Sequence, residues 1–282
     1  MKNVEFRLVE KTNSKIDDVT KYVLEDDEFG KNEVSIIRKK DKVVFCIPTQ
    51  TNCRMGCTFC HLTGTTRPSR NLTSDWLSSV VDYLTEQTQL NKPLLISYMG
   101  VGEPLLSVPA LTDSMWDIHS KYPNTRFGVS TMMPSLVAMQ SIINWCVVNP
   151  QIKVKMHLSV HGVSNRGSII KAGIGVSESI QSIQRFHGAT NLPIEYHYTL
   201  VGGVNDSVEE LMAFNGLVEG DGGTIKFLTL SETNEFQTTL LSNDTVESCF
   251  PRNIVEFYDP PGRDVGASCG MFDKNLYNNT DA

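Results

Sequence analysis

The protein has 282 residues, of which 40% are hydrophobic and 20% are charged, so it can bury a full core without disulfides and is not a disordered or fibrous chain. Its 25 Lys and Arg residues are outnumbered by 32 Asp and Glu residues, and the formal net charge of −7 disfavours broad binding to polyanions. No apolar run approaches the ~20 residues of a membrane span, and the amino terminus lacks a secretory signal, which predicts a cytoplasmic protein that does not act at a membrane.

Short β-branched runs alternate with helical patterns along the chain. A hairpin is expected first, between residues 33–37 and 43–46 across a basic turn. Segments with apolar residues at helical spacing separate the strands that follow. These strands are expected at residues 43–49, 94–99, 127–130, 154–160, 194–201 and 225–230, with one more at 253–258.

Six strand–helix units in succession predict a parallel sheet, because each right-handed crossover needs a helix to return the chain. Six units are too few for a closed eight-fold barrel. The predicted fold class is therefore α/β, a partial (β/α)6 barrel with a short amino-terminal hairpin extension and a carboxyl-terminal strand and loop segment. The expected boundaries are 1–42 for the extension, 43–235 for the core and 236–282 for the carboxyl-terminal segment.

Three of the seven cysteines lie within eight residues, in the C-x3-C-x2-C run of Cys53, Cys57 and Cys60. Such short gaps let one loop wrap three thiolates around a cubane iron–sulfur cluster, leaving one iron with an open site. Zinc is an alternative, because His61 follows Cys60 and structural zinc takes four ligands. Inert core cysteines are a further alternative, but they suit a polar loop with a glycine poorly. The odd number of cysteines disfavours a disulfide framework.

This loop, following the first strand of a partial barrel, resembles that of the radical S-adenosylmethionine (SAM) enzymes. The resemblance implies that Cys53, Cys57 and Cys60 hold a [4Fe–4S] cluster and that SAM chelates its open iron. It also implies an electron donor, such as flavodoxin or ferredoxin, whose electron cleaves SAM to methionine and a 5′-deoxyadenosyl radical. Phe59, an aromatic residue before the third cysteine, is also typical of the superfamily.

Downstream motifs are similar to those of the RlmN/Cfr family, which methylates an adenine carbon in RNA. Residues 99–105 resemble the family's GEPL segment, in which a glutamate binds the SAM amino group through charge-assisted hydrogen bonds. The other matches also follow predicted strands, at the edge where barrel active sites assemble. The SAM-binding residues that the resemblance implies are Gly102, Glu103, Ser130, Ser159, Val160 and His161.

The resemblance also implies roles for two cysteines outside the loop. Residues 266–271 resemble the family's methyl-accepting segment, so Cys269 is expected to carry a methyl group that becomes a radical and adds to the adenine. Cys46, seven residues before Cys53, matches the resolving cysteine, which releases the adduct by forming a disulfide. Glu33 matches an acid/base carboxylate for the adenine proton. The cysteines that match no motif, and are interpreted as structural, are Cys146 and Cys249.

The similarity runs from about residue 33 to about residue 272, with two departures. The family's usual amino-terminal accessory domain has no counterpart in the 32 residues before Glu33. The family's W-N-P segment is replaced by residues 229–234, where Ser231 and Asn234 are candidates for the role of its Asn.

The predicted function is that of a monomeric radical SAM methyltransferase acting on adenine in rRNA or tRNA, at carbon 2 in preference to carbon 8. One alternative is a radical SAM enzyme with a different outcome on a nucleotide or peptide, and another is a non-catalytic, zinc-dependent RNA-binding protein. Unless they form only a solvated face, eight basic residues are expected to line the barrel mouth and contact RNA phosphates. They are Arg38, Lys39, Lys40, Lys42, Arg67, Arg70, Arg166 and Lys171.

Overall fold

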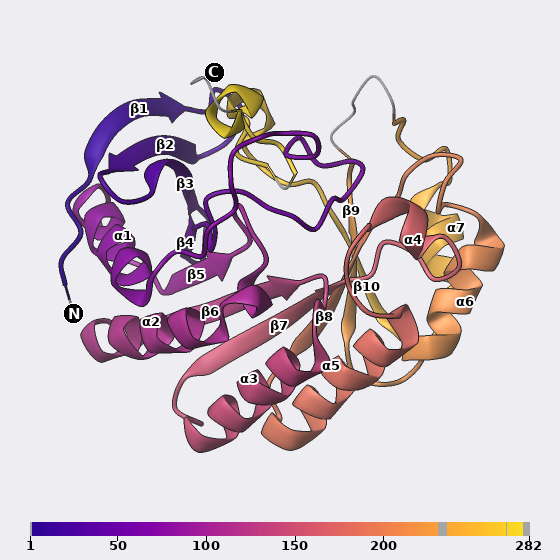
Figure 1. The fold of residues 1–282 in the computed structure, drawn as a ribbon. Helices are drawn as coiled ribbons and strands as arrows, with labels where there is room; N and C mark the ends of the chain where they lie inside the picture. Colours follow the sequence, from indigo (N-terminus) through magenta and orange to yellow (C-terminus); the bar gives the residue numbers. More distant parts are fainter. Residues whose placement is uncertain (1, 231–235, 269, 279–282) are drawn as a thin grey trace.

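The fold is known from a computed structural model that describes residues 2–230, 236–268 and 270–278. Over these residues, ten strands form one sheet in which the spatial order follows the chain (Figure 1). They are β1 (Arg7–Asn13), β2 (Val19–Asp26), β3 (Gly30–Arg38), β4 (Val43–Cys46), β5 (Leu94–Tyr98), β6 (Arg126–Thr131), β7 (Lys153–Ser159), β8 (Ile194–Thr199), β9 (Thr224–Leu228) and β10 (Ile254–Tyr258).

Strand direction divides the sheet into two parts. Neighbours from β1 to β4 are antiparallel, and neighbours from β4 to β10 are parallel. The order leaves β1 and β10 as the two edges, so the sheet is an open, partial barrel and the predicted α/β fold class is confirmed. The predicted hairpin is also confirmed, since Arg38 of β3 pairs with Val43 of β4.

Helices cover the outer face of the sheet, and their buried side chains join those of the strands in one hydrophobic core (Figure 1). Side-chain caps start several of them, as where the Thr73 hydroxyl accepts a hydrogen bond from the backbone N–H of Trp76. The α-helices are α1 (Ser74–Glu86), α2 (Val108–Lys121), α3 (Leu136–Val148), α4 (Arg166–Ile169), α5 (Val176–Thr190), α6 (Val208–Val218) and α7 (Asn243–Ser248), and the 3-10 helices are η1 (Pro104–Leu106), η2 (Arg263–Val265) and η3 (Lys274–Tyr277). Within the described residues, none of these helices has the length and apolar character needed to cross a membrane.

The two faces of the sheet differ in chemistry. Apolar residues at alternate positions, such as Phe127 and Val129 of β6, belong to the core shared with the helices. The intervening residues lie on the concave inner face, because side chains alternate along a strand and paired residues share a face. Ser130 pairs with His157, and His157 pairs with Glu195. The inner face of the parallel part is therefore polar.

The carboxyl-terminal segment returns to the amino-terminal strands (Figure 1). The Gly262 N–H donates to the Asp17 carboxylate at 2.7 Å, and the Ser14 hydroxyl donates to Asp264 at 2.6 Å. Further along, the Arg67 N–H donates to the Tyr277 carbonyl at 2.8 Å. The segments 1–42 and 236–282 are thus in direct contact, and the boundaries proposed for them stay predictions.

Candidate active site

The three clustered cysteines lie in the loop between β4 and α1. Cys57 is buried, and Cys53 and Cys60 are half-buried. The loop is fixed from inside by the Thr63 hydroxyl, which donates to the Cys57 carbonyl at 2.7 Å. A second hydrogen bond joins the loop to helix α4: the Thr58 N–H donates to the Ile169 carbonyl at 2.9 Å. These contacts hold the cysteine loop at the carboxyl edge of the parallel strands.

The surroundings of the cysteines suit metal-bound thiolates. Burial raises the pKa of the Cys53 thiol, whereas the backbone N–H groups of Met55 and Gly102 bond to its sulfur and favour the thiolate. Cys57 interacts electrostatically with the guanidinium of Arg166. Iron–sulfur clusters need such deprotonated sulfurs, and hydrogen bonds to the sulfurs tune them. The three residues therefore fit the cluster that the family resemblance implies.

Gly102 allows its segment to approach the loop closely. Its φ is +110°, a value that disfavours residues with a side chain, and a Cβ there would lie 2.8 Å from the backbone nitrogen of Gln50. The Gln50 side chain in turn accepts the N–H of Glu103 at 2.9 Å. The glycine thus brings Glu103 and the cysteine loop together.

Glu103 has a buried and hydrogen-bonded carboxylate. It accepts hydrogen bonds from the Thr131 hydroxyl at 2.7 Å, the Met132 N–H at 2.7 Å and the Leu105 N–H at 3.0 Å. Burial raises its pKa to about 7, although these bonds and Arg166 oppose the shift. A carboxylate has about four acceptor positions, so one stays available for an ammonium group. Thr131, one residue beyond the predicted Ser130, is a contact that the motif comparison missed.

The predicted serines lie at neighbouring strand ends. The Ser130 hydroxyl of β6 is 3.4 Å from the Ser159 hydroxyl of β7, and both residues are on the inner face. Val160 differs, because its side chain is fully buried in the core and only its backbone can face a ligand. Its N–H donates to the His197 carbonyl at 2.9 Å.

His161 is held in one tautomer beside the cysteine loop. Its Nδ1 accepts the Thr199 N–H at 2.9 Å, which leaves the proton on Nε2. Burial keeps its pKa well below the usual value, so the ring is neutral. Its edge contacts Phe59, with ring centroids 5.1 Å apart. The Asn205 amide donates to the His161 carbonyl at 2.8 Å, so Asn205, in the loop between β8 and α6, positions this histidine.

The prediction that eight basic residues line the barrel mouth is wrong for most of them. Arg166 is buried, and its guanidinium donates to the carbonyls of Ser159, Val160 and Met132, where it joins the ends of β6 and β7. Residues 38–42 lie at the amino end of β4, the edge opposite the cysteine loop.

The two other arginines predicted to line the barrel mouth serve packing. Arg67 donates to the carbonyls of Lys31 and Phe29, and Arg70 lies over the Phe29 ring at 4.8 Å. Sequence alone could not separate these roles, because backbone carbonyls bind an arginine wherever the fold brings them near it.

Glu33 and Cys46 lie on the same face of neighbouring strands. Ser35 of β3 pairs with Cys46 of β4, and Glu33 is two residues away along β3. Glu33 is 6% exposed and forms an ion pair with Lys21 of β2. Burial raises its pKa, whereas Lys21 and the nearby Tyr277 hydroxyl lower it.

Cys269 lies outside the described residues, as do Ser231 and Asn234. The residues that flank position 269 are described. The Gly270 carbonyl accepts the N–H of His61, next to Cys60, at 2.9 Å. On the other side, Gly266 lies next to Lys21, since a Cβ placed on this glycine would be 3.5 Å from Lys21 Nζ. The described residues that flank position 269 are thus bonded to the cysteine loop on one side and lie near Lys21 of the Lys21–Glu33 pair on the other.

Known proteins resemble this chain in sequence and in fold. The chain matches no family model. It is 28% identical over 283 residues to the probable dual-specificity RNA methyltransferase RlmN of Thermotoga neapolitana, covering 94% of this chain and 78% of that protein. It is 26% identical to the dual-specificity RNA methyltransferase RlmN of Rhodopseudomonas palustris strain HaA2, covering 85% of this chain and 64% of that protein. The chain therefore spans less than two thirds of the second relative.

Among solved structures, a radical SAM methyltransferase from Sphaerobacter thermophilus superposes with a TM-score of 0.77 at 21% identity, over 96% of this chain and 82% of that one. SuiB of Streptococcus suis bound to S-adenosylmethionine gives 0.52 at 12% identity, over 78% of this chain and 47% of that one. The fold and the cysteine loop are similar to those of the radical SAM enzymes. Within that class, the chain's similarity to RlmN confirms the resemblance to the RlmN/Cfr-like family.

Proposed function

We propose that the protein methylates an adenine of RNA at carbon 2, with Cys269 as the methyl carrier and Cys46 as the resolving cysteine. The relatives named as RNA methyltransferases support the substrate class. The observation that carries the mechanism is that the described residues flanking position 269 are bonded to the cysteine loop on one side and lie near Lys21 of the Lys21–Glu33 pair on the other. A monomer that receives electrons from a flavodoxin or ferredoxin is part of the same proposal.

Cys53, Cys57 and Cys60 would hold the [4Fe–4S] cluster, and Glu103 would bind the amino group of SAM. When bound, the cluster and SAM supply a carbon-centred radical. The chain's own residues orient the cofactor. The neutral His161 offers its Nε2–H as a donor, and Ser130 and Ser159 offer hydroxyls from the inner face.

The cysteines and Glu33 would release the product. After the methyl carbon of Cys269 has joined the adenine, the Cys46 thiolate attacks the Cys269 sulfur. The new S–S bond replaces the sulfur–carbon bond, whose electron pair stays with the carbon and takes up a proton to complete the methyl group. Glu33 removes the proton that the adenine carbon loses before this attack, and the single electron that the adduct radical gives up with it passes to the oxidised flavodoxin or ferredoxin. The remaining Cys46–Cys269 disulfide must then be reduced by a dithiol before the next turnover.

The proposal is tested by trapping the adduct. Cys46→Ala should accumulate protein linked through Cys269 to RNA, visible after nuclease digestion and peptide mass spectrometry. Cys146→Ala, a change at a buried cysteine of α3, is the matched control and should release methylated RNA. Release of methylated adenine by Cys46→Ala at the wild-type rate would contradict the resolving role.

Two further measurements separate the alternatives. Anaerobically purified protein should contain about four irons and four sulfides per chain, whereas stoichiometric zinc without iron would support a non-catalytic RNA-binding protein. Incubation with SAM should methylate Cys269, and an unmodified Cys269 in cluster-loaded protein would favour a radical SAM enzyme acting on a nucleotide or peptide.

A further inference from the structure

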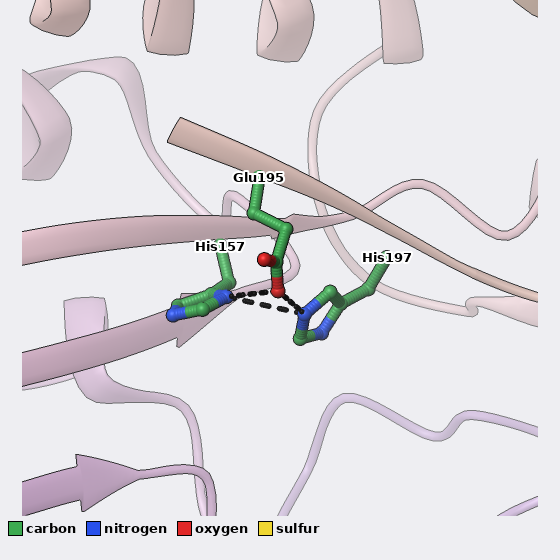
Figure 2. Close-up of side chains that lie close together, drawn as sticks. All are labelled: His157, Glu195 and His197. Atoms are coloured by element: carbon green, nitrogen blue, oxygen red, sulfur yellow. Dashed lines mark hydrogen bonds and ion pairs between the residues drawn. The ribbon is translucent and has the colours of Figure 1, made fainter. Parts of the chain in front are cut away.

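A second group of candidate ligands lies on the inner face of the sheet, apart from the cysteine loop. His157 Nδ1 of β7 is 2.9 Å from Glu195 Oε1 of β8, and His197 Nε2 of β8 is 2.6 Å from the same oxygen (Figure 2). The two ring nitrogens are 3.1 Å apart. All three residues are more than nine-tenths buried. Among the described residues, these three are the His, Cys, Asp or Glu side chains whose ligand atoms lie close enough together to hold one metal ion.

The strands explain why these side chains meet. His157 and Glu195 are paired residues of neighbouring strands, and His197 lies two residues beyond Glu195, so all three share one face. Gly128 on the next strand makes room for the His157 ring, since a Cβ there would lie 3.2 Å from its Nε2. A rigid sheet therefore holds the three ligand atoms together.

We propose that His157, Glu195 and His197 bind a divalent first-row transition metal ion such as Zn²⁺. Zinc binds imidazole nitrogen and carboxylate oxygen at about 2.0–2.2 Å, which places neighbouring ligand atoms roughly 3 Å apart. Two imidazoles and one carboxylate form a common ligand set for zinc and ferrous iron. The ion joins β7 to β8 behind Ser130 and Ser159, which pair with His157 and His197.

The hydrogen bonds within the group show what an ion would replace. His157 Nδ1 and His197 Nε2 both face Glu195 Oε1. An imidazole nitrogen binds a metal through its lone pair, so each ring moves its proton to its other nitrogen or loses it when an ion binds. The ion then takes the place of the protons that now join the three side chains.

Two lysines compete with the ion for the carboxylate. Lys155 pairs with Glu195 Oε2, and Lys226 lies 3.0 Å from Oε1 and 3.1 Å from Oε2. Lys226 also lies 3.3 Å from the half-exposed Glu256. An ion on Oε1 therefore displaces Lys226 toward Glu256, while Lys155 stays on Oε2 as an outer partner of the metal-bound carboxylate. This competition predicts moderate affinity in the wild type and tighter binding once Lys226 loses its charge.

The test uses anaerobic, cluster-loaded full-length protein, in which the cysteine loop is filled by iron. After equilibration with ZnCl₂ and gel filtration, elemental analysis should find one zinc per chain in wild type and in His119→Gln, a control at a histidine near the end of α2. His157→Gln combined with Glu195→Gln should bind none. Lys226→Met should bind zinc at least tenfold more tightly in competition with a fluorescent chelator.

Crystals of the wild-type protein soaked in Zn²⁺ supply a test that no folding defect can obscure. Anomalous density at the zinc edge between the three side chains is the expected result. Its absence, or zinc retained by the double variant, would overturn the proposal. Unchanged affinity in Lys226→Met would overturn the displacement of this lysine.

Discussion

The two parts of the sheet build their halves of the proposed site in different ways. In the parallel part, Ser130 lies near the carboxyl end of β6, and Glu103 lies in the loop after β5, where Thr131 and Met132 at the end of β6 bond to it. In the antiparallel part, Glu33 lies in the middle of β3 and is enclosed by residues about 240 positions away, since the Asp273 N–H approaches its carboxylate at 3.5 Å.

This difference separates cofactor binding from substrate chemistry. The half proposed to bind the cluster and SAM depends on successive strand ends, which a parallel sheet brings to one edge whatever the chain termini do. The half proposed to handle the adenine proton exists only when the carboxyl-terminal segment lies on β2 and β3. Variants of the first half should therefore lose cofactor, whereas variants of the second should keep the cofactor and lose methyl transfer.

The largest effect is expected from Cys57→Ala in the first half. Loss of one of three cluster ligands should reduce the iron content to near zero and abolish SAM cleavage and methyl transfer together. Iron and sulfide analysis with an assay of SAM cleavage measures both. Cys249→Ala, a change at a buried cysteine after α7, should retain both. A Cys57→Ala protein with full iron content would remove this residue from the ligand set.

The next effect is expected from Glu103→Gln. A hydrogen bond to a charged group contributes about 1.5–3 kcal/mol, so the affinity for SAM should fall by roughly 10- to 150-fold, with iron content unchanged. The pH dependence follows from the sign of the shift. The pKa of Glu103 is raised to about 7, so wild-type SAM affinity should rise as pH increases from 6 to 8. Isothermal titration should show this rise in wild type and a flatter profile in the variant, and equal slopes would contradict it.

The parallel half was the part most accessible to sequence analysis. Its β-branched strands predicted β4 to β10, and the spacing of Cys53, Cys57 and Cys60 indicated the loop. Strands β1 and β2 were missed because neither alternates. β1 is an almost wholly exposed edge strand, and β2 is buried on both faces, including Lys21. Alternation of apolar and polar residues reveals a strand with one buried and one solvent-exposed face more readily than either of these strands.

Contacts between side chains of distant segments could not be predicted from the sequence either. The burial of Arg166 depends on three carbonyls that only the folded strand ends bring together. The histidine–glutamate group did leave a signal, since β7 and β8 carry polar residues at alternate positions within otherwise apolar strands. Such alternation in a central strand indicates a polar inner face, but it does not reveal which polar atoms meet.

A smaller effect should follow from Lys21→Met in the second half. Lys21 lowers the pKa of Glu33, which burial raises, so its loss should keep Glu33 protonated to a higher pH. A base must be deprotonated to act, so on the acidic limb of the rate profile methyl transfer at a fixed pH should fall about tenfold for each unit by which that pKa rises. The acidic limb of the rate profile should move to higher pH. Iron content and SAM affinity should match those of Lys11→Met, a control on exposed β1. An acidic limb at the same pH in Lys21→Met and wild type would contradict the role of Lys21 in setting the pKa of Glu33.

The smallest effect is expected from Tyr277→Phe. The Tyr277 hydroxyl is fully buried beside Glu33 and lowers the pKa of that carboxyl, although the two groups do not meet in good hydrogen-bond geometry. Two buried polar groups that are only weakly paired with each other can both turn to a polar group of the substrate. Removal of this weakly paired hydroxyl should change the free energy of unfolding by less than about 1 kcal/mol.

Methyl transfer by Tyr277→Phe should fall roughly 2- to 10-fold through a higher KM for RNA, since a neutral hydrogen bond contributes about 0.5–1.5 kcal/mol. SAM cleavage without RNA should stay at the wild-type rate, because a phenylalanine ring keeps the packing of position 277 on Leu62 of the cysteine loop. Denaturant unfolding and steady-state kinetics of the same preparation measure the two quantities. A variant that loses stability but keeps its KM would assign Tyr277 to packing alone and would restrict the substrate half to Glu33, Lys21 and the cysteines.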